Sequence, residues 1–307
     1  MTGIINLYKP SGITSFGAVA AVRKLFGERR CGHGGTLDPE ASGVLPVLLG
    51  KATRLSDVFL GMRKTYESAL RFGCSYDTGD VWGKVTEAAG ADHEKLIREL
   101  SPESIGAVLP RFTGTIVQLP PAYSALKIGG VPAYKLARKG ETPGLKPREV
   151  NVYGIELTGF TPSGAEGKPA EVSLRVECGR GTYIRTLCCD IAAALGLPGA
   201  MSSLRRVSYG PLDAGNAVSL EELTEYASAK NGAALTGALL PCDVILGDFP
   251  ELRLSREREN DYFAGRPVYD ETGLPDGALA KVLGDDGSLL GVGRVDGGVV
   301  KSKISLI

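Results

Sequence analysis

Residues 32–39 read G-H-G-G-T-L-D-P, and an apolar run from Val44 to Leu49 follows them. Three glycines in four positions disfavour a long helix or strand, because glycine inside either element costs roughly 0.5–1 kcal/mol relative to alanine. The apolar run predicts a buried strand. The sequence therefore predicts a loop that holds one carboxylate, Asp38, at the mouth of a core strand, where glycines let another backbone come close. Because Asp-Pro also starts ordinary turns, a purely structural turn stays open on these residues alone.

The composition places limits on the class of protein. A length of 307 residues suits two domains, and 35 basic residues balance 35 acidic ones, so net charge gives no argument for a polyanionic partner. Six cysteines without a C-x-x-C pair and only two histidines give no zinc pattern, so we expect no metal and reduced thiols. We see no signal peptide and no unbroken apolar run of transmembrane length. These features predict a cytoplasmic protein with no membrane segment.

Local patterns predict most of the secondary structure. Alternation of apolar and polar residues predicts strands at 64–72, 150–160 and 170–178. Helix N-caps are expected at Ser15, Ser101, Thr182 and Ser219, the last as a capping box with Glu222, and a helix is expected over residues 51–60. After Gly247 the chain turns to short apolar segments separated by Gly/Asp turns, near 267–269, 278–282, 289–295 and 299–304. This change predicts a small second β domain.

Five motifs occur along the chain in a fixed order. They are the Asp38 loop, K-T-Y at 64–66, P-P-A-Y-S-A-L-K at 120–127, G-T-Y-I-R at 181–185 and L-R-R at 204–206. Together they resemble the TruB family of tRNA pseudouridine synthases, which make pseudouridine-55 in the T-loop of tRNA. The resemblance covers residues 3–247 and implies an α+β catalytic domain over residues 1–247, with a mixed, mostly antiparallel sheet flanked by helices, the pseudouridine synthase fold. For residues 248–307 it implies a small β-rich PUA-like domain that binds RNA, on position alone.

The resemblance also assigns roles to residues. It implies that Asp38 is the catalytic aspartate, that Arg185 pairs with it, and that Tyr66 stacks on the target base. The implied substrate contacts are His33, Tyr183, Leu204 and Asp80. His33 would fill the space that the flipped base leaves, and Leu204 would pack against the base. On sequence alone His33 is as well explained by a turn, and Tyr66 by sheet packing. The run 76–80 departs from the family's Thr-rich pattern, which puts an RNA contact there in doubt.

A basic stretch lies in the predicted RNA-binding insertion, about residues 114–148. Its cations are interleaved with tyrosines, which suits stacking on RNA and contact with its backbone. The predicted RNA contacts in it are Lys127, Arg138 and Lys139. An ordinary solvated face explains the same composition. In the resembled family this segment is a mobile flap that orders over the RNA.

The implied reaction needs no redox step and no lost atoms, so no cofactor is expected. It breaks the C1′–N1 bond of uridine and forms C1′–C5. Water would capture the sugar while the base is detached, so one carboxylate in a dry pocket suits it better than the two carboxylates of glycoside hydrolysis. Burial disfavours a charged acid, and the guanidinium of Arg185 would keep Asp38 ionised. We expect a monomer that acts on the T-stem-loop of tRNA without an obligate protein partner.

Two other functions stay open on the sequence. A non-catalytic RNA-binding module or tRNA chaperone of the same fold would use the basic stretch and the C-terminal domain. A phosphate-binding glycine-loop enzyme would rest on Gly32–Gly35 and Gly50-Lys51 only, where the P-loop pattern fails because Leu45 and Ala52 stand at two required positions.

Overall fold

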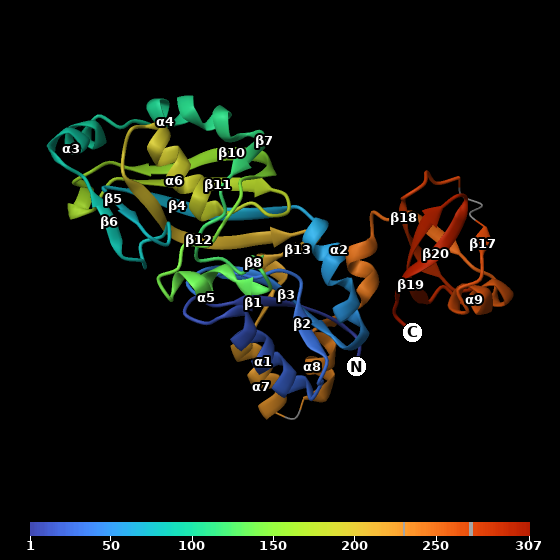
Figure 1. Cartoon of the computed structure of the whole chain (residues 1–307). Coiled ribbons are helices and arrows are strands. Elements are labelled where there is room, and N and C mark those ends of the chain that lie inside the picture. Colours follow the sequence, from blue (N-terminus) through green and yellow to red (C-terminus); the bar gives the residue numbers. More distant parts are fainter. Residues whose placement is uncertain (230, 270–272) are drawn as a thin grey trace. The chain divides into compact units, whose positions relative to one another are not determined.

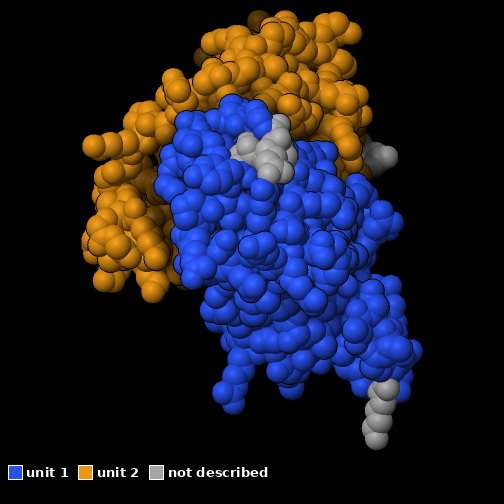
Figure 2. Space-filling view, turned by 90° about the vertical axis from the view of Figure 1, so that its right-hand side faces the viewer, with its two compact units in different colours: residues 1–39, 43–60, 209–307 blue, residues 40–42, 61–208 orange. Residues whose placement is uncertain are grey.

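The computed structural model describes residues 1–229, 231–269 and 273–307 of the chain (Figure 1). The chain forms two compact units (Figure 2). Unit 1 comprises residues 1–39, 43–60 and 209–307, and unit 2 comprises residues 40–42 and 61–208. This division into units differs from the one predicted at residue 247, which stays a prediction.

The sheet of unit 1 is built on β1 (Gly3–Lys9). This strand runs antiparallel to β3 (Ser42–Leu49) and parallel to β14 (Val218–Ser219). Two short strands extend this sheet: β15 (Leu239–Leu240) pairs with β1, and β2 (Cys31–His33) pairs with β3. Residues 43–49 of β3 are all buried, so the strand that follows the Asp38 loop is a core strand as predicted.

Helices and short turns complete the first part of unit 1. They are α1 (Ser15–Phe26), the 3₁₀ segment η1 (Gly50–Leu55), α2 (Ser56–Gly61), η4 (Ala214–Asn216), α7 (Leu220–Ser228), α8 (Gly232–Gly237) and η5 (Cys242–Leu246). Helices α1 and α7 pack together, as do α7 and α8 (Figure 1). The predicted Ser219 capping box is confirmed. The single helix predicted over 51–60 was wrong, because the segment is a 3₁₀ turn that continues into a short α-helix.

The last part of unit 1 is a five-stranded sheet with one helix. The strand order is β16 (Glu251–Arg253), β18 (Leu279–Leu283), β19 (Leu289–Asp296), β20 (Val299–Ser305) and β17 (Val268–Tyr269). Helix α9 (Arg256–Phe263) packs on β17 and β20. Its apolar core includes Leu252, Tyr262 and Val282. The predicted C-terminal β-rich region is confirmed, and β16 is an additional strand that the sequence did not indicate.

Unit 2 is a sheet covered by helices. Its strand order is β12 (Gly199–Tyr209), β4 (Lys64–Phe72), β11 (Glu171–Cys178), β10 (Arg148–Thr161) and β7 (Gly114–Gln118). The pairings β4–β11, β11–β10 and β10–β7 are antiparallel. Alternate residues of β11 are buried, which explains why alternation predicted this strand correctly. Two hairpins add β5 (Cys74–Tyr76) with β6 (Val85–Ala88), and β8 (Lys127–Ile128) with β9 (Val131–Pro132).

The helical elements of unit 2 are α3 (Ala91–Arg98), α4 (Pro102–Val108), η2 (Leu109–Phe112), α5 (Ala133–Ala137), η3 (Ala165–Gly167) and α6 (Ile184–Ala194). Helix α6 packs on β4 and α4 packs on β10 (Figure 1). The predicted cap at Ser101 is confirmed. The mixed, mostly antiparallel α+β architecture is therefore as predicted. Within the described ranges, every helix is too short or too polar to cross a membrane.

Two helix caps were wrong, and both hydroxyls are used elsewhere. Thr14 rather than Ser15 caps α1, accepting from the Gly17 N–H at 2.9 Å. Tyr183 rather than Thr182 is the N-cap of α6, and it makes no side-chain cap bond. The Thr182 hydroxyl instead donates to the Gly179 carbonyl at 3.3 Å, closing the turn before the helix.

Candidate active site

The Asp38 loop is tied to the start of α1 by hydrogen bonds on both sides of the aspartate. The Ser15 hydroxyl accepts from the Leu37 N–H and donates to the Leu37 carbonyl, both at 2.9 Å. The Gly12 N–H donates to the Pro39 carbonyl at 3.0 Å. Leu37 is buried and Asp38 is partly buried. The backbone on either side of Asp38 is therefore fixed, while the carboxylate keeps some exposure.

Lys9 contributes a further anchor from inside the core. Its side chain is fully buried, and its ammonium donates to the carbonyls of Pro10, Ile13 and Pro39 at 2.8, 2.8 and 2.9 Å. A buried charge is tolerated only where it is paired or fully hydrogen-bonded. Lys9 thus joins the end of β1, the turn after it and the residue that follows Asp38.

Replacing Lys9 with methionine is expected to lower the free energy of unfolding by on the order of 3 kcal/mol, because three carbonyls around the buried ammonium lose a charged donor. Urea unfolding followed by circular dichroism measures the difference. Lys24→Met, the same change at an exposed position of α1, is the matched control and should cost less than about 0.5 kcal/mol. Equal losses in the two variants would contradict the anchoring role of Lys9.

Two of the loop's glycines allow close approach of aromatic rings. A Cβ on Gly34 would lie 2.7 Å from Cγ of Phe59, and one on Gly35 would lie 2.9 Å from the Tyr209 hydroxyl. These two rings meet edge to face at 5.5 Å, and the Tyr209 hydroxyl donates to the Gly34 carbonyl at 2.9 Å. The predicted approach of another backbone was wrong at these two glycines, because the side chains of Phe59 and Tyr209 approach them instead. His33 lies just before them, at the end of β2 opposite Val47.

Arg185 is the centre of a network in unit 2. It is the second residue of α6 and is 5% exposed. Its Nη1 donates to the Thr78 carbonyl at 2.7 Å and its Nη2 to the Tyr123 carbonyl at 2.9 Å. Its Nε lies 3.7 Å from Oδ2 of Asp80. A planar guanidinium suits such a divided task, because its donors point in fixed directions.

Asp80 is held by its own loop as well as by Arg185. Its Oδ1 accepts from the Thr78 hydroxyl at 2.7 Å and from the Trp82 N–H at 3.2 Å. The carboxylate therefore has three neighbours within unit 2. Its predicted contact with RNA stays a prediction. Its position beside Arg185 suits it to orient the guanidinium of that arginine.

Tyr66 and Leu204 are both nearly buried, at 8% and 9% exposure, on β4 and β12. The hydroxyl of Tyr66 accepts from Nη1 of Arg206 at 3.4 Å, and Arg206 is itself buried. Both side chains belong to unit 2, together with Tyr183 and Arg185. Their predicted contacts with the target base stay predictions.

Lys64 lies two residues before Tyr66 and is 8% exposed, with its ammonium donating to the Met62 carbonyl at 2.9 Å. Burial, together with the positive charge of Arg206, lowers the pKa of Lys64 from 10.5 to about 8. Below the lower value both the folded and the unfolded chain carry the proton, so the whole cost of burying the charge is present. Between the two values the folded chain is the first to lose its proton, and its stability rises with pH.

The wild-type protein is therefore expected to gain about 2 kcal/mol of unfolding free energy relative to Lys64→Met between pH 7 and pH 9.5. Urea unfolding of both proteins at the two pH values measures this difference. Lys84→Met removes an exposed lysine from the same unit and should follow the wild type. The same pH dependence in wild type and Lys64→Met would show that Lys64 titrates normally.

The predicted RNA-binding cations Lys127, Arg138 and Lys139 are all exposed. Arg138 also lies over the ring of Tyr134, with 5.6 Å between its guanidinium carbon and the ring centroid. Arg148, at the end of the same basic stretch, is used differently: it donates to the Gly181 carbonyl and lies over the Tyr183 ring. The first three side chains are thus exposed, and their contact with RNA stays a prediction, whereas Arg148 is tied to the start of α6.

The predicted site residues fall in both units. Asp38 and His33 belong to unit 1, and the other predicted residues belong to unit 2. Unit 2 brings Arg185 and Asp80 together. The predicted pair of Asp38 with Arg185 joins residues of different units and stays a prediction.

Sequence reasoning missed Lys9, Lys64 and Gln118, although each had a signal. Lys9 ends an otherwise apolar strand, and Lys64 begins the K-T-Y motif. Gln118 ends β7 and lies two residues before the P-P-A-Y segment. Periodicity reads such polar residues at strand ends as solvent-exposed, whereas all three are buried.

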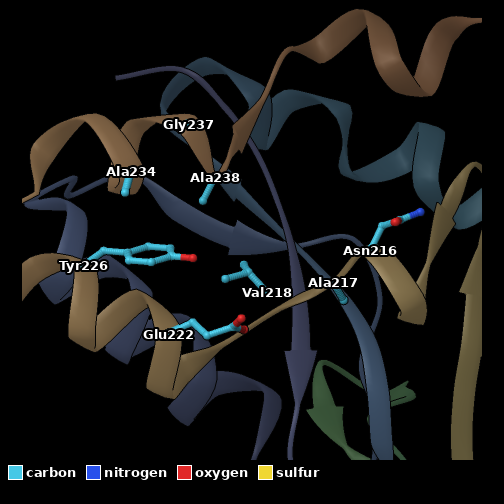
Figure 3. Close-up of a pocket in the computed structure, with 8 residues that line it drawn as sticks. All are labelled: Asn216, Ala217, Val218, Glu222, Tyr226, Ala234, Gly237 and Ala238. Atoms are coloured by element: carbon cyan, nitrogen blue, oxygen red, sulfur yellow. The ribbon is translucent and has the colours of Figure 1, made fainter.

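A pocket of about 370 Å³ lies in unit 1 between α7, α8 and the strand before α7 (Figure 3). Glu222 and Tyr226 point into it from α7 (Figure 3). The Glu222 carboxylate accepts from the Ser219 N–H at 2.8 Å, so its task is to cap the helix. The predicted site residues do not line this pocket.

Comparisons with known proteins identify the family. The profile described as TruB family pseudouridylate synthase (N terminal domain) matches residues 23–184. Those for the tRNA pseudouridylate synthase B C-terminal domain and for pseudouridine synthase II TruB, C-terminal, match 185–247 and 250–304. The chain belongs to the TruB family.

Full-length relatives of the TruB family agree with this assignment. The protein is 40% identical over 307 residues to tRNA pseudouridine synthase B of Synechococcus elongatus, covering 99% of this chain and 98% of the relative. It is 37% identical over 311 residues to the Aquifex aeolicus protein of the same name, covering 100% of both.

Solved structures confirm the fold. A chain of the archaeal box H/ACA sRNP Nop10–Cbf5 complex superposes with a TM-score of 0.72 at 24% identity, covering 99% of this TruB-family chain and 86% of the other. A chain of an H/ACA RNP bound to a substrate RNA gives 0.73 at 24% identity, covering 99% and 85%. The pseudouridine synthase fold is therefore the fold of this protein.

Proposed function

We propose that this protein is a tRNA pseudouridine synthase that isomerises the T-loop uridine at position 55, without a cofactor. The supporting observation is the Asp38 loop, whose backbone is fixed by Ser15, Gly12 and Lys9 in a chain of the TruB family. A carboxylate on such a loop is pre-positioned for a reacting atom, and positioning supplies much of the rate enhancement in enzymes. The relatives named tRNA pseudouridine synthase B support tRNA as the substrate.

In the proposed reaction, tRNA binds through its T-stem-loop and the target uridine leaves its stack. Extruding a base costs a few kcal/mol, which contacts to the displaced and neighbouring bases offset. His33 would occupy the vacated space, while Tyr66 and Leu204 hold the flipped uracil. Lys127, Arg138 and Lys139 would contact the RNA backbone, because exposed cations supply most of the affinity for phosphates.

Asp38 would then act on the nucleotide while Arg185 keeps its carboxylate charged. Three steps are compatible with one carboxylate: attack on C1′, attack on the base, and removal of the C2′ proton. If Asp38 attacks C1′ or the base, the bond that it forms must break again before the product leaves; if it removes the C2′ proton, that proton must return to C2′. In each case the C1′–N1 bond breaks, the uracil turns, C1′–C5 forms, C5 loses its proton to solvent and N1 takes up a proton, so that the product is an isomer of uridine. Arg185 would serve both Asp38 and Asp80, since a guanidinium has five donors in fixed directions.

Release of tritium from T-arm RNA labelled at C5 of uridine tests this function, because forming C1′–C5 expels the C5 proton. We expect one tritium released per RNA, from the target uridine alone. An RNA with cytidine at that position is the control and should release none from the loop. Tight binding of the T-arm without any release would favour the RNA-chaperone alternative instead.

A further inference from the structure

Gln118 is the only glutamine in the chain, and its side chain is 1% exposed. Its amide faces the backbone of Tyr183: the Tyr183 N–H donates to Oε1 at 3.0 Å, and Nε2 donates to the Tyr183 carbonyl at 3.3 Å. Because a backbone N–H can only donate, the amide fits in one orientation. Gln118 therefore holds the backbone of Tyr183 at two points.

This contact lies at the N-terminus of α6, where backbone N–H groups require acceptors from outside the helix. Tyr183 is the N-cap of α6 and has no side-chain cap, and the first N–H groups of a helix have no partner within the helix. In a capping box, the third helical residue would accept from the N-cap N–H. Here that residue is Thr186, whose hydroxyl donates to the Leu119 carbonyl at 3.4 Å. Gln118 thus supplies from β7 the acceptor that α6 lacks.

Arg148 acts beside Gln118. The two residues face each other in the β7–β10 ladder. Nη2 of Arg148 donates to the Gly181 carbonyl, and its guanidinium carbon lies 4.9 Å from the centroid of the Tyr183 ring. A cation over an aromatic face is attracted to it and restricts the ring. Neighbouring positions on two paired strands therefore hold Gly181 and Tyr183 in place.

The held segment leads directly into Arg185, the second residue of α6. Its guanidinium must reach the carbonyls of Thr78 and Tyr123, at 2.7 and 2.9 Å. A small shift at the start of α6 would misplace these bonds, and misplacement of about 1 Å can cost on the order of 100-fold in rate.

We propose that Gln118 and Arg148 are positioning residues of the isomerisation, which fix the start of α6 so that Arg185 and Tyr183 are held ready for the substrate. The inference rests on the proposed function. It also removes Arg148 from the RNA-binding surface, because its guanidinium serves the protein's own backbone.

Gln118→Met keeps the size of the side chain and removes both hydrogen bonds. Arg148→Met keeps an unbranched side chain of similar length and removes both the bond to Gly181 and the cation over the Tyr183 ring. Because Arg148 is only partly buried, this variant provides a second test should Gln118→Met fold poorly. Thr115→Val is the matched control, since it removes an exposed 2.9 Å hydrogen bond to Asn151 from the same β7–β10 ladder.

Three measurements decide the proposal. In single turnover on T-arm RNA, Gln118→Met and Arg148→Met should each lower the rate roughly tenfold while Kd changes less than about threefold. Combined with Arg185→Lys, either change should cost less than about twofold more, because residues that act through one another are non-additive. Amide hydrogen exchange of the peptide containing Tyr183 should speed up roughly tenfold. Thr115→Val should alter none of these.

The opposing outcomes are equally defined. If Arg148→Met weakened RNA binding without slowing the reaction, Arg148 would be an RNA contact. If the effects of Gln118→Met or Arg148→Met were fully additive with that of Arg185→Lys, these residues would act independently of Arg185. Either result overturns the proposal. Unchanged hydrogen exchange at Tyr183 would overturn it without reference to activity. If the wild type were inactive but hydrogen exchange at Tyr183 were still faster in the variants, Gln118 and Arg148 would hold the start of α6 as proposed, and the proposed function would be refuted.

Discussion

Replacing Asp38 with asparagine is expected to reduce tritium release from T-arm RNA by at least about 10³-fold. Asparagine keeps the size of the side chain but can neither attack carbon nor take a proton. The hydrogen bonds that fix the loop go to the backbone of Leu37 and Pro39, so the loop should keep its conformation. RNA affinity should change less than about threefold, since one neutralised acid contributes little to phosphate contacts.

Asp57→Asn is the matched control, because it makes the same change at an exposed aspartate of unit 1. It should retain full activity. Undiminished product from Asp38→Asn would show that another group carries the chemistry. A loss of RNA binding equal to the loss of rate would instead make Asp38 a binding residue.

Arg185→Lys should lower the single-turnover rate by about 10²-fold or more while Kd for the T-arm changes far less. The lysine keeps the charge but has one nitrogen where Arg185 uses three, toward Thr78, Tyr123 and Asp80. Breaking a buried pair at one partner costs on the order of 3–5 kcal/mol, because the other groups stay buried without their donor. Part of this loss should show as a lower Tm.

Arg175→Lys is the matched control on the surface of unit 2. Arg175 lies 3.3 Å from Glu67 with both side chains about half exposed, and such pairs are worth about 0–1 kcal/mol. It should leave rate and Tm nearly unchanged. If Arg185→Lys lost affinity but kept its turnover, Arg185 would be an RNA contact and the proposed partner of Asp38 would be wrong.

Strands and the C-terminal sheet could be predicted from the sequence because burial leaves a pattern in it. Alternate residues of β11 are buried, and residues 43–49 of β3 are buried without a break. Helix starts were less certain because several hydroxyls compete. Thr14 and Ser15 can each cap α1, and only the contact between Ser15 and Leu37, distant in sequence, decides between them.

The motifs in the sequence predicted the candidate site residues. They did not predict the residues that hold the backbone beside these site residues. Lys9 and Gln118 are polar residues at strand ends, where solvent exposure is the usual expectation. Both are buried because backbone carbonyls and an N–H of other segments satisfy them. Arg148 lies in the basic stretch that suits contact with RNA, and charge alone does not show that its guanidinium has a partner in its own chain.

A crystal structure of the protein with a T-arm RNA carrying 5-fluorouridine at the target position tests the central claim most directly, since fluorine at C5 cannot leave as a proton. The account predicts that the Asp38 carboxylate lies within about 4 Å of the Arg185 guanidinium, in contact with a uracil extruded from the loop. An Asp38 separated from Arg185 by solvent, or a target base still stacked in the T-loop, would contradict it.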